Sequence, residues 1–150
     1  MITIDDFLKL DIRIGTVLEA VKVPEADRLL QLIFDFGELT EGTTLTPTLS
    51  QEEREIKESS STGSGNINYL PELVEKYPGK DVRQIMSAIA PFIPDPSVLV
   101  GKQIAVVTNL EPRKFKGYIS QGMIMATDTE DGQISLMIPE RKVEPGSKIH

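Results

Sequence analysis

The sequence contains no cysteine and no tryptophan, and its one histidine, His150, is the last residue. The lack of cysteine excludes a disulfide framework and a thiolate metal site. A single terminal histidine is a poor basis for a histidine-ligated zinc centre or for histidine-based acid–base chemistry. We therefore predict no catalytic residue, no metal site and no cofactor.

Long apolar runs are also absent. No run approaches the roughly 18 residues of a membrane-spanning helix, and no signal-peptide pattern opens the chain. These absences predict a cytoplasmic protein with no membrane partner. A length of 150 residues predicts one domain, residues 1–150. The net charge of −7 argues against a protein that coats nucleic acid by bulk charge, so any such binding needs a local basic surface.

Short segments with strand character recur along the chain. Residues 30–37 alternate most clearly, with four large apolar side chains on one face of the segment. Gly15 indicates a bulge or bend in the first strand, and Asp131-Gly132 indicates a hairpin turn before a further strand at 133–138. The strands that we expect in the main sheet are residues 11–17, 30–37, 82–90, 102–110 and 120–127.

Helical patterns are few and short. Residues 4–10 indicate one helical turn, for which either Thr3 or Asp5 could be the N-cap. Residues 70–77 have helical apolar spacing with Pro71 near the start, and residues 96–99 can form one turn before Gly101.

Residues 39–81 interrupt the strand pattern and are predicted to be an acidic, partly disordered insertion. They hold eight acidic and four basic side chains, which is more than half of the net negative charge. Residues 59–65 have linker composition, and residues 50–53 have capping-box spacing. Two roles remain open: a tolerated surface insertion without function, or a flap that rests near a basic face and competes with RNA.

Residues 109–123 are the most informative segment. They lie between two apolar runs, which predicts a loop that connects two strands. Arg113, Lys114 and Lys116 fall within four positions around Phe115. Cations neutralise phosphates and an aromatic face can stack on a base, so this loop suits a nucleic-acid backbone. On charge alone, an ordinary solvated surface loop is the commoner explanation.

The pattern Asn-Leu-x-Pro-Arg-Lys-x-x-Gly-x-x-Ser-x-Gly-Met, which starts at Asn109, resembles the signature of the tRNA-binding OB domain family. This family includes the C-terminal domain of bacterial methionyl-tRNA synthetase, stand-alone tRNA-binding proteins, export-related chaperones and the domain of endothelial monocyte-activating polypeptide II. The resemblance extends to residues 7–36 and 82–148. It implies an all-β fold, a five-stranded OB barrel with short helices and extra C-terminal strands, with residues 39–81 inserted between the second and third strands.

The resemblance also implies a function and a set of RNA-binding residues. It implies a non-catalytic binding module for tRNA that recognises shape at the outer corner of the L, either stand-alone, as Met1 just before the domain favours, or appended to a synthetase. It further implies a homodimer, for which we expect the N-terminal turn and the C-terminal extension to form the interface. The alternative from the same family is a small chaperone that binds unfolded polypeptide as a dimer. The RNA-binding residues that it implies are Arg28, Arg83, Asn109, Arg113, Lys114, Lys116, Gly117, Ser120 and Met123.

Overall fold

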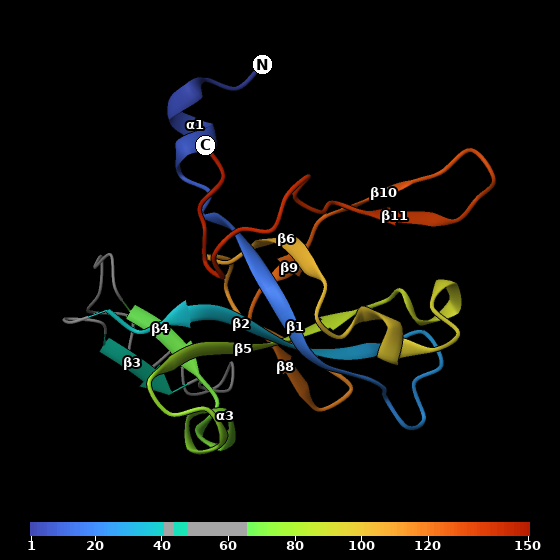
Figure 1. Ribbon diagram of the computed structural model, residues 1–150, viewed down its shortest axis with the longest axis horizontal. Coiled ribbons are helices and arrows are strands. Elements are labelled where there is room, and N and C mark those ends of the chain that lie inside the picture. Colours follow the sequence, from blue (N-terminus) through green and yellow to red (C-terminus); the bar gives the residue numbers. More distant parts are fainter. Residues whose placement is uncertain (41–43, 48–65) are drawn as a thin grey trace.

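A curled sheet of five antiparallel strands, in the order β5-β2-β1-β6-β9, organises the molecule (Figure 1). The computed structural model describes residues 1–40, 44–47 and 66–150. The predicted all-β, OB-like architecture with only short helices is confirmed. The five strands are β1 (Ile12–Lys22), β2 (Leu30–Glu38), β5 (Lys80–Ser87), β6 (Gln103–Val107) and β9 (Met123–Ile124).

The core fills the inside of this curled sheet. Alternate residues of β2 point inward, and Leu30, Leu32 and Phe34 are fully buried there. Strand β1 serves both halves of the barrel, since its first half pairs with β6 and its second half pairs with β2. Gly15 lies at this change of partner, and a Cβ atom there would come within 2.8 Å of the Phe34 ring. The register shift itself falls between Val17 and Glu19, so the bulge lies beyond the glycine.

The barrel closes between β5 and the segment that leads into β9. The N–H of Gln121 donates to the carbonyl oxygen of Gln84 at 2.8 Å, and the N–H of Gln84 donates to the side-chain oxygen of Gln121 at 2.9 Å. The N–H of Met86 donates to the hydroxyl of Ser120 at 3.0 Å. Where β5 meets the segment before β9, which is the seam of the barrel, buried polar side chains thus add hydrogen bonds to those between backbone groups.

The helices are short, as expected. In α1 (Ile4–Leu8), Thr3 is the N-cap and forms a capping box with Asp6. Two 3₁₀ turns, η1 (Ala90–Phe92) and η2 (Pro96–Leu99), connect β5 to β6, and Leu99 is buried in the core. Helix α3 (Pro71–Lys76) confirms the helix predicted near residues 70–77.

The C-terminal residues add a hairpin and then a terminal segment, from Gly146 to Ile149, that lies beside β1 and is called the C-terminal strap below. The hairpin of β10 (Ala126–Asp128) and β11 (Ile134–Leu136) turns at the predicted Asp131-Gly132 and extends away from the barrel (Figure 1). The last residues then run beside the first half of β1, where Gly146 donates to Ile14 at 2.7 Å and Ile149 donates to Ile12 at 2.8 Å. Both chain ends therefore lie on one side of the molecule (Figure 1).

Within residues 39–81, the structure adds a pair of parallel strands that the sequence did not predict, β3 (Thr44–Pro47) and β4 (Asn66–Tyr69). Leu70 and Leu73 pack with Ile33 and Val82 on the outside of the barrel. The expected capping box at residues 50–53 and the linker at 59–65 lie outside the described residues. Among the helices of the described ranges, none is long and apolar enough to cross a membrane.

Candidate nucleic-acid interface

The basic segment forms a β-hairpin rather than a plain loop. Strands β7 (Arg113–Phe115) and β8 (Tyr118–Ser120) pair antiparallel, and Lys116 and Gly117 join them with φ values of 49° and 89°. Positive φ at both central residues is the pattern of a type I′ turn, whose twist matches that of paired strands. The hairpin escaped prediction because its strands have only three residues each and Lys-Gly is an unusual dipeptide for such a turn.

The three cations of the hairpin are exposed, and none of them has an ion-pair partner within residues 1–40, 44–47 and 66–150. Arg113 lies opposite Ser120, and Lys114 lies opposite Ile119. Directly opposite residues share a face and successive residues alternate, so Arg113 and Lys114 point to opposite faces of the hairpin. Positive charge therefore surrounds the hairpin instead of forming one flat patch.

The face with Lys114 is the one directed toward the outside of the barrel. Its neighbour Ile119 packs against the outer apolar cluster that contains Ile33 and Leu73. The carbonyl oxygen of Ile119 also accepts a 2.9 Å bond from the side chain of Gln84. Lys114 is therefore on the same side of the sheet as helix α3.

Arg28 is exposed in the turn between β1 and β2. This turn adjoins the pairing of Leu30 with Ser87, and strand β8 of the hairpin bonds to Gln84 and Met86 of the same strand β5. The register therefore places the hairpin beside Gln84 and Met86, whose partners on β2, Ile33 and Gln31, follow Arg28 by five and three residues.

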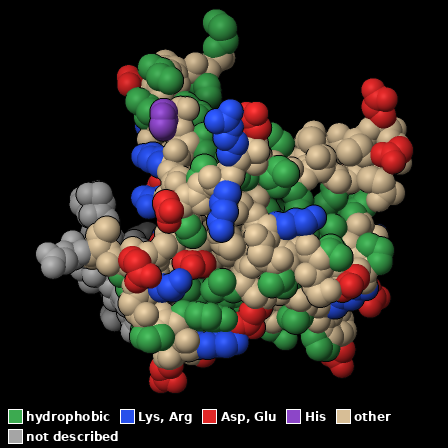
Figure 2. Space-filling view, viewed as in Figure 1, with side chains coloured by type: hydrophobic (Ala, Val, Ile, Leu, Met, Phe, Trp, Pro, Cys, Tyr) green, Lys and Arg blue, Asp and Glu red, His purple; other side chains and the backbone are tan. Residues whose placement is uncertain are grey.

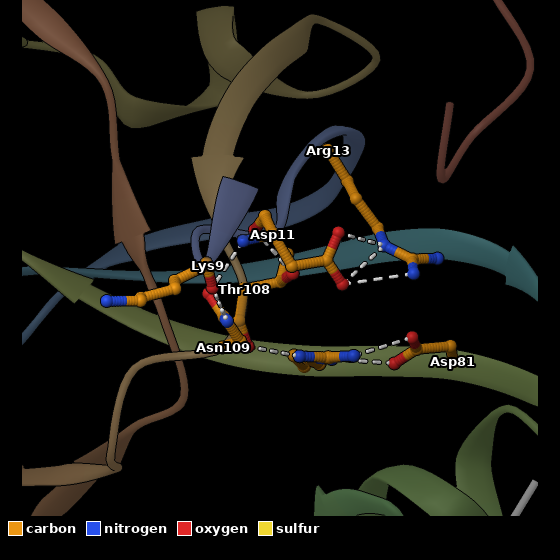
Figure 3. A network of polar contacts seen from close by, with 7 residues as sticks. Lys9, Asp11, Arg13, Asp81, Thr108 and Asn109 are labelled. Carbon is orange, nitrogen blue, oxygen red and sulfur yellow. Dashed lines mark hydrogen bonds and ion pairs between the residues drawn. The ribbon is translucent and has the colours of Figure 1, made fainter. Parts of the chain in front are cut away.

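Asn109 belongs to a polar network that joins the N-terminal helix to the start of the basic segment (Figure 3). Its side-chain amide donates to the carbonyl of Lys9 at 2.7 Å, and its side-chain oxygen accepts from the N–H of Asp11 at 2.8 Å. The neighbouring Thr108 donates its hydroxyl to the carbonyl of Asp11 at 2.8 Å. Asn109 is exposed, but both functional groups of its side chain bond to the backbone of the protein.

Arg83 extends this network into the barrel end. Its guanidinium makes two hydrogen bonds to the Asp81 carboxylate, at 2.8 and 2.9 Å, and a third to the carbonyl of Thr108 at 2.7 Å. It also lies 5.4 Å from the centre of the Phe36 ring. The side chain is only 12% exposed, so the structure gives Arg83 a scaffold position.

Ser120 and Met123 differ sharply in their accessibility. Ser120 is buried, and its hydroxyl accepts from Met86 and donates to the carbonyl of Gly122 at 3.1 Å. The Met123 side chain is 53% exposed on β9. Gly117 has no neighbouring atom within 4 Å of the position of a Cβ, so the turn is open to solvent.

A polar latch fixes α3 to the barrel. The Glu19 carboxylate on β1 accepts hydrogen bonds from Lys76 and Tyr77 at the end of α3. The Lys76 bond, and then the Tyr77 bond, hold the pKa of Glu19 below its ordinary value. The same carboxylate raises the pKa of Lys76 and of Tyr77. Sequence reasoning missed this latch because its residues are more than fifty positions apart.

The molecular surface as a whole shows mixed charge. On the face in Figure 2, basic and acidic side chains alternate over short distances, and acidic side chains gather at the end of the projecting β10–β11 hairpin. This fits the net charge of −7. A polyanion would therefore meet favourable potential only near local groups of cations.

Comparison with known proteins finds relatives among tRNA ligases. The chain is 38% identical over 148 residues to the methionine–tRNA ligase of Parabacteroides distasonis and 35% identical to that of Archaeoglobus fulgidus. Each match covers 99% of this chain and 16% of the relative, so the chain spans a small part of these enzymes.

Two solved structures share the fold over the whole chain. A MetRS-related protein from Pyrococcus horikoshii superposes with a TM-score of 0.66 at 27% identity, covering 100% of this chain and 98% of the other. The chaperone CsaA from Bacillus anthracis gives a TM-score of 0.65 at 25% identity, covering 100% and 99%. The family model described as a putative tRNA binding domain matches residues 77–148. The resemblance that the signature indicated is therefore confirmed, since residues 77–148 of this chain match the model of the putative tRNA binding domain family.

Proposed function

We propose that this protein is a non-catalytic module that binds tRNA by its folded shape. The observation that carries the proposal is the β7–β8 hairpin, whose three exposed cations have no ion-pair partner among the described residues. A rigid hairpin that offers charge but few base-reading groups favours recognition of the backbone over recognition of sequence.

The nine candidate residues divide into two roles under this proposal. Arg28, Arg113, Lys114 and Lys116 neutralise phosphates, while Gly117 lets the turn approach the RNA closely and Met123 packs on a ribose or base. The remaining three, Arg83, Asn109 and Ser120, hold the hairpin in place, because their polar groups already bond within the protein.

Salt dependence tests the phosphate contacts directly. Four neutralised phosphates predict that log K for bulk tRNA falls against log salt with a slope of about −3. The double variant Lys114→Glu, Lys116→Glu should lose binding while it keeps its circular dichroism spectrum and melting temperature. A matched double variant, Lys102→Glu with Lys142→Glu, makes the same change of charge away from the hairpin and should bind nearly as the wild type does. Equal loss in both doubles would contradict the assignment.

The proposal also covers the cellular location of the module and the protein of which it is part. It places one domain, residues 1–150 with the insertion 39–81, in the cytoplasm, either alone or as part of a longer tRNA ligase such as its relatives. Catalysis would then belong to other parts of the longer protein.

We further propose that two copies of the chain form a homodimer. Exposed apolar side chains lie on α1, with Ile4 at 69% and Leu8 at 60%, and after β11, with Met137 at 47% and Ile138 at 63%. Phe7 of α1 and Ile149 of the C-terminal strap pack on one apolar cluster, which brings the two chain ends together. Light scattering at micromolar concentration should give twice the mass of the chain, and a monomer would remove this part of the proposal.

A second candidate function is the binding of unfolded polypeptide by such a dimer. The fold similarity to the chaperone CsaA and the exposed Met123 and Met137 favour it, since methionine side chains adapt to varied apolar partners. Titration of one sample with tRNA and with a reduced, unfolded protein separates the two functions. Binding of the polypeptide alone would favour the chaperone, and binding of tRNA alone would favour the RNA-binding module.

A further inference from the structure

A pocket of about 200 Å³ lies on the outer face of the barrel, between helix α3 and the sheet. Its floor comes from β1, β2 and β5, with Val21, Ile33 and Gln84 among the lining residues, and its wall is α3, with Glu72 and Leu73. Pockets that hold a whole small ligand usually measure about 300–1,000 Å³. The size therefore suits one ring system rather than a complete nucleotide.

The position of the pocket relates it to the cations described above. Two lining residues of β2, Gln31 and Ile33, pair with Met86 and Gln84 of β5. The same two residues of β5 bond to Ser120 and Ile119 of the β7–β8 hairpin, and the Arg28 turn precedes Gln31 by three residues. A nucleic-acid strand bound to the cations of the hairpin would therefore pass beside the pocket.

The pocket lining offers hydrogen-bond acceptors that complement the donor groups on the edge of a nucleobase. The side-chain amide of Gln31 donates to Gln84 at 2.7 Å, and that of Gln84 donates to the carbonyl of Ile119 at 2.9 Å. This chain of bonds leaves the side-chain oxygen of Gln31 as an acceptor without a partner in the described part of the chain. Glu72 adds a carboxylate that makes no ion pair there. Apolar side chains of Ile33 and Leu73 provide surfaces on which a flat ring can pack.

The charges of the lining residues indicate that the pocket excludes phosphate. Two carboxylates, Glu19 and Glu72, line it with one ammonium, Lys76, and Lys76 is already bonded to Glu19. A phosphate would meet net negative charge inside the pocket. Lys114 lies on the hairpin face directed toward α3 and has no ion-pair partner among the described residues.

Resting on the tRNA binding proposed above, we propose that this pocket receives one unstacked nucleobase of the bound RNA, whose phosphate lies on Lys114. The acceptors Gln31 and Glu72 select bases with an exocyclic amino group over uracil, which presents carbonyl oxygens in that place. Unstacked bases in loops are the parts of RNA that proteins read on their edges. The insertion thus completes a base-binding site in addition to covering the sheet.

Filling the pocket tests this inference. Val21 is 49% exposed on β1, and Val21→Tyr places a ring in the pocket without touching the core. The matched control is Val98→Tyr, at a valine that is 51% exposed and does not line the pocket. We expect Val21→Tyr to weaken binding of bulk tRNA about tenfold, at the low end of what a stacked base contributes, with an unchanged salt slope. Val98→Tyr should bind as the wild type does.

A second measurement reports on the base itself. In NMR titrations of the full chain, cytidine and adenosine monophosphates should shift the side-chain amide signals of Gln31 and Gln84 more than uridine monophosphate does. Wild-type affinity in Val21→Tyr, or equal shifts with all nucleotides, would overturn the base pocket while tRNA binding stands. If the wild type does not bind tRNA at all, both the pocket and the proposed function fall.

Discussion

Gln121 is bonded twice to the backbone of Gln84, once through its own N–H and once through its side-chain oxygen. Gln121 is 2% exposed and Gln84 is 7% exposed, so both bonds lie out of contact with water. They join β5 to the segment that leads into β9, and β5 and β9 would otherwise be the free edges of the five-stranded sheet. Barrel closure, and with it the position of the β7–β8 hairpin just before Gln121, depends on this pair.

We predict that Gln121→Ala destabilises the protein by about 1–3 kcal/mol, the usual cost of leaving a buried donor without a partner. The unpaired group is the N–H of Gln84. Urea denaturation followed by circular dichroism measures the change. The control is Gln133→Ala, because Gln133 is exposed and its backbone N–H and carbonyl form hydrogen bonds that alanine retains. Equal stability of the two variants would show that the seam does not contribute as described.

The C-terminal strap approaches β2 most closely at Gly146. A Cβ atom there would lie 2.1 Å from the carbonyl oxygen of Phe36, and φ is +87°. Gly132 has a similar φ of +76° but no atom within 4 Å of a Cβ. Gly132→Ala should therefore cost about 1–2 kcal/mol from backbone strain alone. Gly146→Ala should cost a further 1–3 kcal/mol or so from overpacking. Thermal unfolding of both variants measures the difference, and equal melting temperatures would contradict the close approach.

The Glu19 latch predicts a dependence of stability on pH. The folded-state pKa of Glu19 lies below its value in the unfolded chain, which is about 4.3. Its contribution is therefore complete above that pH and is lost as the pH falls through the folded-state pKa. Because the Glu19 side chain is 39% exposed, we expect Glu19→Gln to cost less than about 1 kcal/mol at pH 7.

The free energies of unfolding of wild type and Glu19→Gln should converge as the pH falls below 4. Urea titrations between pH 3 and pH 7 measure this convergence. Glu130→Gln, at the exposed end of the β10–β11 hairpin, should change the stability at pH 7 by less than about 0.5 kcal/mol. A constant difference between wild type and Glu19→Gln over the whole range would contradict the latch.

Local patterns in the sequence predicted the strands whose faces differ clearly. Strand β2 alternates apolar and polar residues, and the structure buries the predicted face. The seam at Gln84 and Gln121 could not be predicted in this way, because its partners are 37 residues apart and both are polar. The β7–β8 hairpin was missed because three residues are too few to show a period of two.

The residues of the candidate site also divide into those that local sequence patterns predict and those that they do not. Basic residues that cluster in the sequence, such as Arg113 and Lys114, are also together and exposed in space. Asn109 and Ser120 bond to Lys9 and Met86, and no local pattern indicates such distant partners. For Arg83 a signal existed: Asp81 lies two residues earlier on the same strand, and i, i+2 residues share a face.

The turn of the hairpin allows charge and shape to be separated at a single residue. Lys116 has a φ of 49°, a left-handed conformation that lysine rarely adopts, whereas Asn-Gly is the preferred pair for a type I′ turn. Lys116→Asn should therefore leave stability unchanged or raise it by up to about 1 kcal/mol. If Lys116 contacts a phosphate, the same variant should weaken tRNA binding and reduce the salt slope by about 0.7–0.9.

Lys114→Asn is the matched variant, because it removes the same charge from a strand position where asparagine has no conformational advantage. It should reduce the salt slope equally, without the gain in stability. Thermal unfolding and fluorescence anisotropy with labelled tRNA at several salt concentrations measure both quantities. If Lys116→Asn kept full affinity and the wild-type slope, the turn would have only a structural role, and the phosphate contacts would lie on the strands of the hairpin.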